Sequence, residues 1–138
     1  MPYAATTDVP VVRTRAEIER VLIKHGAEGF AYGWTKDFDK IEFSWNGRHI
    51  RFLLPRPKRD TGDTPRQIRN LEQHDRQRWR ALLLVVKAKL EAVESGISVF
   101  EEEFLAFIVM QDDRTIGEHL VPRLKEGTLG VKLLGESK

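Results

Sequence analysis

The residues of this sequence best suited to bind a ligand are nine basic side chains in the middle of the chain. Eight of the nine are arginines, and a planar guanidinium group can donate two parallel hydrogen bonds to one phosphate. The nine candidates are Arg48, Arg51, Arg56, Lys58, Arg59, Arg66, Arg69, Arg76 and Arg80. We expect them to form one continuous band that contacts the phosphates of DNA or RNA. Because no base-reading motif accompanies them, such binding should depend on salt and show little sequence selectivity.

The same basic cluster has a second interpretation, in which it is a solvated surface neutralised by acids. The acids available are Asp60, Asp63, Glu72, Asp75 and the run Glu101–Glu103. Charged surface side chains commonly pair in this way without any role in binding. A structure distinguishes the two interpretations, because only the first leaves the guanidinium groups turned toward solvent.

Three aromatic residues, Tyr32, Trp34 and Trp45, are candidates for stacking on nucleic-acid bases. Such a stack stabilises a complex by about 1–3 kcal/mol per base. However, the period-two alternation over residues 30–54 places the large apolar side chains on one face of a sheet. Because an apolar face is usually buried, we expect a packed core, with stacking confined to Trp34 and Trp45 at the strand ends.

No set of residues for catalysis or metal binding is evident. The four histidines, His25, His49, His74 and His119, are widely spaced, and none belongs to a ligand-spaced pair. The sequence also has no cysteine, no Gly-x-Ser-x-Gly motif and no glycine-rich phosphate loop. We therefore predict a protein that is not an enzyme and that needs no metal or cofactor. A site assembled from scattered residues remains a third hypothesis.

Length and composition indicate one domain over residues 1–138, with loosely ordered ends at residues 1–13 and 127–138. The chain is 41% hydrophobic and 32% charged, with a formal net charge of +2, as is typical of folded proteins in water. The longest apolar run, Ala81–Val86, is too short to cross a membrane. Without cysteine or a signal peptide, the protein is expected to be cytoplasmic and to have no membrane partner.

Four helices and three strands must position these side chains. Helices are predicted from about residue 15 to 24, from 65 to about 94, from Ser98 through Met110, and from Ile116 to Pro122. Each helix follows a Ser or Thr placed three residues before a Glu or Gln, which is a capping box. The four boxes are Thr14–Glu17, Thr64–Gln67, Ser98–Glu101 and Thr115–Glu118. The fold class is therefore α+β: an N-terminal helix, a three-stranded antiparallel β-meander covered by a long helix, and two shorter C-terminal helices.

The dipeptide Asn46-Gly47 determines how the second and third strands pair. It is the strongest short signal for a two-residue hairpin turn of type I′. A turn of this length fixes the register, so that opposite residues can be named. The predicted opposite pairs are Phe43–Ile50, Ile41–Phe52, Glu42–Arg51 and Ser44–His49.

Three segments together cover most of the chain: RAEIERVLIKHGAEGFAYGW, IEFSWNGRHIRFLLPRP and RQRWRALLLVVKAKLEAVESGISVFEEEFLAFIVMQDDRTIGEHL. These segments resemble a family of small uncharacterised proteins of bacteriophages, prophages and other mobile elements, and the resemblance covers roughly residues 1–124. It implies a protein of a bacterial host cell, made where DNA is replicated, recombined or defended. It implies no particular activity and no site residues.

Two functions fit these observations. The first is a non-enzymatic nucleic-acid-binding accessory protein of a phage or mobile element, which contacts phosphates through the arginine-rich loop and helix. The second is a protein-binding module, such as an inhibitor of a host or defence enzyme, or a protein that assembles with itself as a homo-oligomer. Salt-dependent binding to DNA or RNA would favour the first, and a host-protein complex or an oligomer would favour the second.

Overall fold

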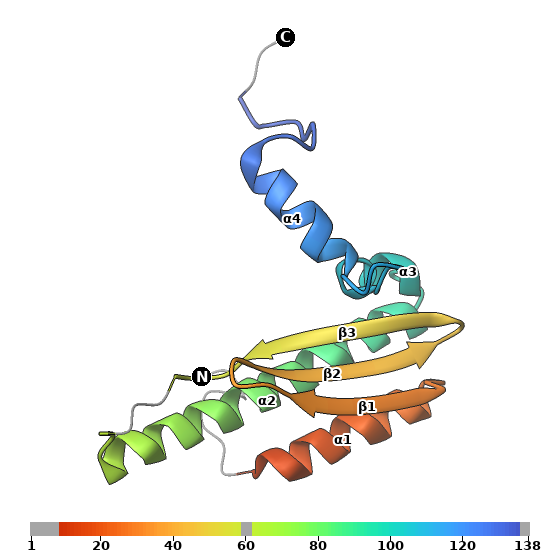
Figure 1. Cartoon of the computed structure of the whole chain (residues 1–138). Coiled ribbons are helices and arrows are strands. Elements are labelled where there is room, and N and C mark those ends of the chain that lie inside the picture. Colours follow the sequence, from red (N-terminus) through yellow and green to blue (C-terminus); the bar gives the residue numbers. More distant parts are fainter. Residues whose placement is uncertain (1–8, 59–61, 136–138) are drawn as a thin grey trace.

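The computed structural model describes residues 9–58 and 62–135, and it has the predicted α+β architecture (Figure 1). Its elements are α1 (Val11–Lys24), β1 (Gly29–Trp34), β2 (Phe38–Trp45), β3 (Arg48–Pro55), α2 (Pro65–Glu94), α3 (Phe100–Glu103), the 3₁₀ helix η2 (Leu105–Phe107) and α4 (Ile116–Glu126). The three strands form one sheet in the order β1-β2-β3, and both neighbouring pairs are antiparallel. None of the described helices is long and apolar enough to span a membrane.

The β2–β3 hairpin has the predicted turn and register. Asn46 and Gly47 adopt φ angles of 47° and 77°, and a type I′ turn requires positive φ at both central positions. All four predicted pairs are present, from Ile41 opposite Phe52 to Ser44 opposite His49. The register is therefore confirmed, and it places alternate residues of β2 and β3 on the apolar face.

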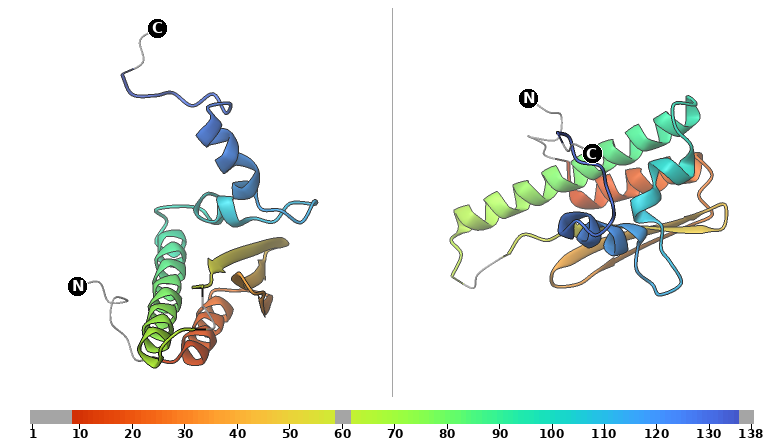
Figure 2. Two further views of the ribbon diagram at one scale, coloured as in Figure 1. Left: turned by 60° about the vertical axis from the view of Figure 1, so that its left-hand side comes forward. Right: turned by 90° about the horizontal axis from the view of Figure 1, so that it is seen from above.

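Two helices cover the apolar face of the sheet (Figure 2). Trp79, Leu83 and Val86 of α2 and Ile18 and Leu22 of α1 are almost completely buried. They belong to one hydrophobic core together with the inward-facing residues of β2 and β3. Burying one large apolar side chain stabilises a fold by roughly 1.5–3 kcal/mol, so this helix–sheet contact is the main source of stability.

The long helix α2 begins with the predicted capping box. Thr64 Oγ1 accepts a hydrogen bond from the Gln67 amide at 3.2 Å, and Gln67 Oε1 accepts one from the Thr64 amide at 2.7 Å. Pro65 is the first helical residue, where its missing N–H leaves no helical bond unmade. The first turns of α2 extend beyond the end of the sheet (Figure 1).

The predicted start of the first helix is wrong. α1 begins at Val11, because the carbonyl of Pro10 accepts hydrogen bonds from the amides of Arg13 and Thr14. Thr14 therefore lies inside the helix, where its side chain is buried and does not cap. Residues 11–13, expected to belong to a loosely ordered end, are part of this helix.

The helix predicted from Ser98 is replaced by a short helix and an extended segment. The Ser98 amide donates to the Ala92 carbonyl at 3.0 Å and so completes the end of α2, and α3 has only four residues. Further along, the Val109 amide donates to the His49 carbonyl at 2.8 Å, on the outer edge of β3. The β-branched pair Ile108 and Val109 suits this extended conformation better than a helix.

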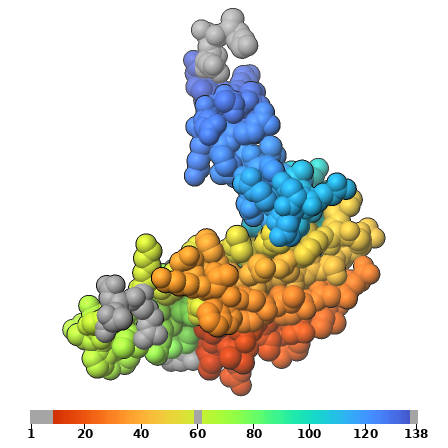
Figure 3. Space-filling model, viewed as in Figure 1, coloured from red at the N-terminus to blue at the C-terminus, as the bar shows by residue number. Residues whose placement is uncertain are grey.

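The last helix, α4, continues through Pro122, where it was expected to end. Proline cannot donate to the carbonyl four residues earlier, which here belongs to Glu118. Arg114 Nη2 donates to that carbonyl at 3.2 Å instead. The helix then ends at Gly127, whose φ of 78° is left-handed. α4 packs against η2 and projects away from the sheet and α2 (Figures 1 and 3).

Candidate nucleic-acid interface

Among the predicted phosphate-binding residues that the structure describes, several form ion pairs within the protein. The pairs are Arg48–Glu101 at 3.3 Å, Arg51–Asp113 at 2.9 Å, Arg56–Asp39 at 3.6 Å and Arg80–Glu17 at 3.0 Å. The acids come from four different segments of the chain, and only Glu101 is among those that the sequence indicates. These four guanidinium groups are therefore engaged with acids of the protein itself.

Arg51 lies on the face of the sheet opposite the helices, yet it is only 8% exposed. Its guanidinium donates to the backbone carbonyl of Asp113 at 2.7 Å and to the Asp113 carboxylate at 2.9 Å. Burial alone would lower the pKa of Arg51, but the hydrogen bonds to Asp113 and the charge of Glu42 outweigh burial and raise it. Arg51 therefore fastens the loop before α4 to the sheet.

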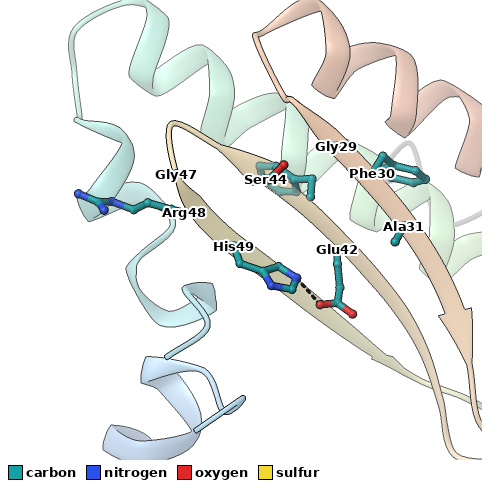
Figure 4. Close-up of a pocket in the computed structure, with 9 residues that line it drawn as sticks. Gly29, Phe30, Ala31, Glu42, Ser44, Gly47, Arg48 and His49 are labelled. Atoms are coloured by element: carbon teal, nitrogen blue, oxygen red, sulfur yellow. Dashed lines mark ion pairs between the residues drawn. The ribbon is translucent and has the colours of Figure 1, made fainter. Parts of the chain in front are cut away.

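A shallow hollow lies beside Arg51 on the same face of the sheet. The small residues Gly29, Ala31 and Ser44 contribute to its lining, and the Glu42 carboxylate forms an ion pair with His49 at one side (Figure 4). Partial burial alone would raise the pKa of Glu42, but Lys40, Arg51 and His49 hold it below its usual range. Across residues 9–58 and 62–135, no group of three or more His, Asp or Glu side chains is placed to hold a metal ion.

Arg80 lies between α1 and α2 and is only 9% exposed. Its Nη1 donates to Glu17 at 3.0 Å, and Lys87 Nζ donates to the other carboxylate oxygen of Glu17 at 3.2 Å. Burial alone would raise the pKa of Glu17, but these hydrogen bonds and charges outweigh burial and lower it. Arg80 thus joins two helices and is not exposed to a large ligand.

The other predicted basic residues lie on or just before the first half of α2. Lys58, Arg66 and Arg69 are exposed, and none of them forms an ion pair with another described residue. Arg76 is partly buried and donates to Gln73 at 2.6 Å. Arg59 lies outside the described residues. Among the predicted residues that the structure describes, the exposed cations without an ion pair, Lys58, Arg66 and Arg69, therefore lie together at the end of the molecule where α2 begins.

Of the three candidate stacking residues, Tyr32 and Trp45 are engaged within the protein. The Arg15 guanidinium lies 3.9 Å from the centroid of the Tyr32 ring, and the Tyr32 hydroxyl donates to Asp39 at 2.9 Å. The Trp45 ring stacks on Phe100, with ring centroids 3.9 Å apart. Trp34, in contrast, is 65% exposed.

Arg56 positions Trp34. The Arg56 amide donates to the Asp37 carbonyl at 2.8 Å, and Nη1 donates to the Thr35 carbonyl at 3.2 Å, so Arg56 is fixed to the β1–β2 turn. Its guanidinium lies 5.1 Å from the centroid of the Trp34 ring, a distance suited to a cation–π contact. The indole is therefore oriented by the protein but remains largely open to solvent.

A groove of about 990 Å³ lies next to Arg56. It is lined by residues 36–38 of the β1–β2 turn and start of β2, by residues 55–58 at the end of β3 and just after it, and by Leu71, Glu72 and Asp75 of α2. Lys36 and Phe38 were missed as site residues by sequence reasoning. Their position shortly after Trp34, in the turn and at the start of β2, was the available signal.

No family model matches the chain, and neither a characterised protein nor a solved structure matches it. The function must therefore be argued from the geometry of the protein itself. The best candidate for a binding site is the end of the molecule where the exposed indole and the exposed cations lie. We call it the Trp34 surface, and it consists of Trp34, Lys36, Arg56, Lys58, Arg66 and Arg69.

Proposed function

We propose that the protein binds single-stranded DNA or RNA through the Trp34 surface and catalyses no reaction. The observation that carries this proposal is the indole of Trp34, which is 65% exposed and lies against the guanidinium of Arg56. Exposed aromatic rings among cations are the usual means by which proteins hold single strands without reading their sequence. In the context that the resemblance to phage and mobile-element proteins implies, such binding would make the protein an accessory protein acting on the nucleic acid of such an element.

Single strands are favoured over duplexes because a duplex hides the faces of its bases. A base stacked on an exposed aromatic ring contributes about 1–3 kcal/mol, and every base has such a face. The phosphates on either side of a stacked base carry the negative charge that Lys58, Arg66 and Arg69 complement. These three cations are exposed and form no ion pair within the described part of the chain, so binding need not break an existing contact.

Fluorescence anisotropy with a mixed-sequence single strand of about 16 nucleotides tests the proposal. We expect Trp34→Ala to weaken binding by about 5- to 100-fold, which corresponds to the loss of one stacked base. The double variant Arg66→Ala/Arg69→Ala should reduce the slope of log affinity against log salt by about 1.4, or about 0.7 per lost phosphate contact.

The matched control is Arg123→Ala/Lys125→Ala, which removes the same charge from α4, where both side chains are exposed. This control should leave the salt slope unchanged. If the wild-type protein shows no binding at low salt, or if the Trp34 variant binds as tightly as the wild type, the proposal is wrong.

A second candidate function, protein binding or self-assembly, is favoured by α4. No residue of this helix is buried within the described structure, and Val121 and Leu124 are 43% and 49% exposed. The following residues Val131 and Leu134 are also exposed. Light scattering should show an oligomer for the wild type and a monomer for Val121→Ser/Leu124→Ser. A monomeric wild type that also captures no protein from a bacterial lysate would contradict this function.

A further inference from the structure

The groove beside Arg56 combines apolar, acidic and basic surface, the basic part formed by Lys36, Arg56 and Lys58. Its apolar walls include Phe38, which is 38% exposed, and Leu71 of α2. Carboxylates line it from two sides, Asp37 from the turn and Glu72 and Asp75 from α2. A ligand that fills this groove must therefore offer flat apolar area together with hydrogen-bond donors.

The carboxylates are available as acceptors. Asp75 accepts a hydrogen bond from Arg78 at 2.8 Å through one oxygen, Oδ1, and each carboxylate oxygen has more than one lone pair. Glu72 is exposed and forms no ion pair with any residue that the structure describes. An ionised carboxylate only accepts hydrogen bonds, and it repels phosphate. The carboxylate side of the groove thus disfavours the backbone of a nucleic acid and favours a donor on a base.

The groove also adjoins the stacking residue, because Arg56 belongs to both. Its guanidinium contacts the Trp34 ring, and the same residue lines the groove with Lys58. A strand whose base stacks on Trp34 can place a neighbouring base in the groove, while Lys36 and Lys58, which also line it, meet the phosphates. The groove has a volume of about 990 Å³, which is at the upper end of the range for ligand pockets, so it is large enough for a base.

Bases differ in the donors that they present. Cytosine carries an exocyclic amino group at position 4, whereas uracil and thymine carry a carbonyl oxygen there, and Asp and Glu accept hydrogen bonds from the cytosine amino group in nucleic-acid complexes. Building on the proposed function, we propose that this groove selects bases with an exocyclic amino group, cytosine above uracil and thymine, through Glu72 and Asp75.

The sharpest test compares two ligands that differ at one position. Oligodeoxycytidylate and oligodeoxyuridylate of about twelve nucleotides, both near neutral pH, have the same backbone and ring size. We expect the cytosine strand to bind at least about fivefold more tightly to the wild type, the lower end of the discrimination that a good base contact provides.

Three variants assign the preference to the groove. Glu72→Gln and the double variant Glu72→Gln/Asp75→Asn replace acceptors by amides that also donate, so the preference for cytosine should shrink toward unity. Glu72 is exposed and its single variant should fold normally, which keeps the test valid if the Asp75 variant does not. Glu102→Gln on α3 is the matched control, since it removes the same charge from an exposed side chain outside the groove, and it should keep the full preference.

The possible outcomes separate the two proposals. Equal binding of both strands by the wild type, or an unchanged preference in Glu72→Gln and the double variant, would overturn the base selection and leave the proposed function standing. Absence of binding to either strand would overturn both. A cytosine preference that Glu72→Gln reduces and Glu102→Gln retains would establish the groove as the base-selecting site.

Discussion

The two halves of α2 carry the same kinds of side chain but use them differently. In the C-terminal half, Leu83 and Val86 are buried under the sheet, and Arg80 and Lys87 are paired with Glu17 of α1. In the N-terminal half, which extends beyond the sheet (Figure 1), Arg66 and Arg69 are exposed and unpaired within the described residues. One helix thus covers the hydrophobic core with its C-terminal half and presents charged side chains to solvent with its N-terminal half.

The difference shows that tertiary neighbours decide what a cation does. Arg80 and Arg69 lie on the same helix, and the sequence gives no sign that they differ. Glu17, the partner of Arg80, is 63 positions away in the chain and approaches only because α1 packs beside α2. Where no second helix lies alongside, as at Arg66 and Arg69, the guanidinium groups stay in solvent.

The largest difference between the two halves of α2 is expected in the free energy of unfolding when one apolar residue of each half is replaced by alanine. Leu83→Ala should lower the free energy of unfolding by about 2–5 kcal/mol, because the side chain is 0% exposed and leaves a cavity. Leu71→Ala in the N-terminal half should lower it by only about 1 kcal/mol, since that residue is partly exposed. Urea unfolding measures both. Equal losses would mean that the first half of α2 is as much a part of the core as the second.

A smaller effect is expected for the two arginines. Arg80→Ala should lower the free energy of unfolding by roughly 1–3 kcal/mol, because it removes one partner of the mostly buried Glu17 pair. Arg69→Ala should change it by less than about 0.5 kcal/mol, as is usual for an exposed side chain without a partner. If the two variants are equally stable, the pairing of Arg80 has no structural role and the comparison fails.

The wild type and Arg80→Ala should also differ in how their free energy of unfolding depends on pH. In the folded protein the pKa of Glu17 is lowered from its ordinary value of 4.5, so the ion pairs contribute fully above that value. Their contribution is lost as the pH falls through the lowered pKa of the folded state. The wild type should therefore lose more stability than Arg80→Ala between about pH 6 and pH 3.

Local signals made the hairpin and the start of α2 predictable. Asn46-Gly47 selects its turn from the backbone conformations that these two residues tolerate, and the two-residue loop then sets the register. The capping box of Thr64 and Gln67 likewise involves only residues within one turn. The exposure of Trp34 was also expected, because it lies at the end of its strand.

Long-range contacts could not be predicted in the same way. The capping signal of Ser98 is present in the sequence, but the end of α2 and the edge of β3 compete for the residues that follow. A proline usually ends a helix. At Pro122 the helix α4 continues, and Arg114 donates to the Glu118 carbonyl that the proline leaves without a backbone donor. For the candidate site, the acids that pair with Arg51 and Arg80 come from remote segments, so nothing in the sequence showed that these two guanidinium groups are paired within the protein.

The contact between Arg51 and Asp113 has a consequence for the whole C-terminal region. Asp113 has a φ of 67°, in the left-handed region that aspartate adopts more readily than most residues, and its carbonyl and carboxylate both accept from Arg51. One arginine on the edge strand β3 therefore helps to set the direction in which α4 leaves the sheet. Replacing Arg51 would remove both bonds to Asp113 and so weaken the attachment of the loop before α4, while the core on the opposite side of the sheet would stay packed.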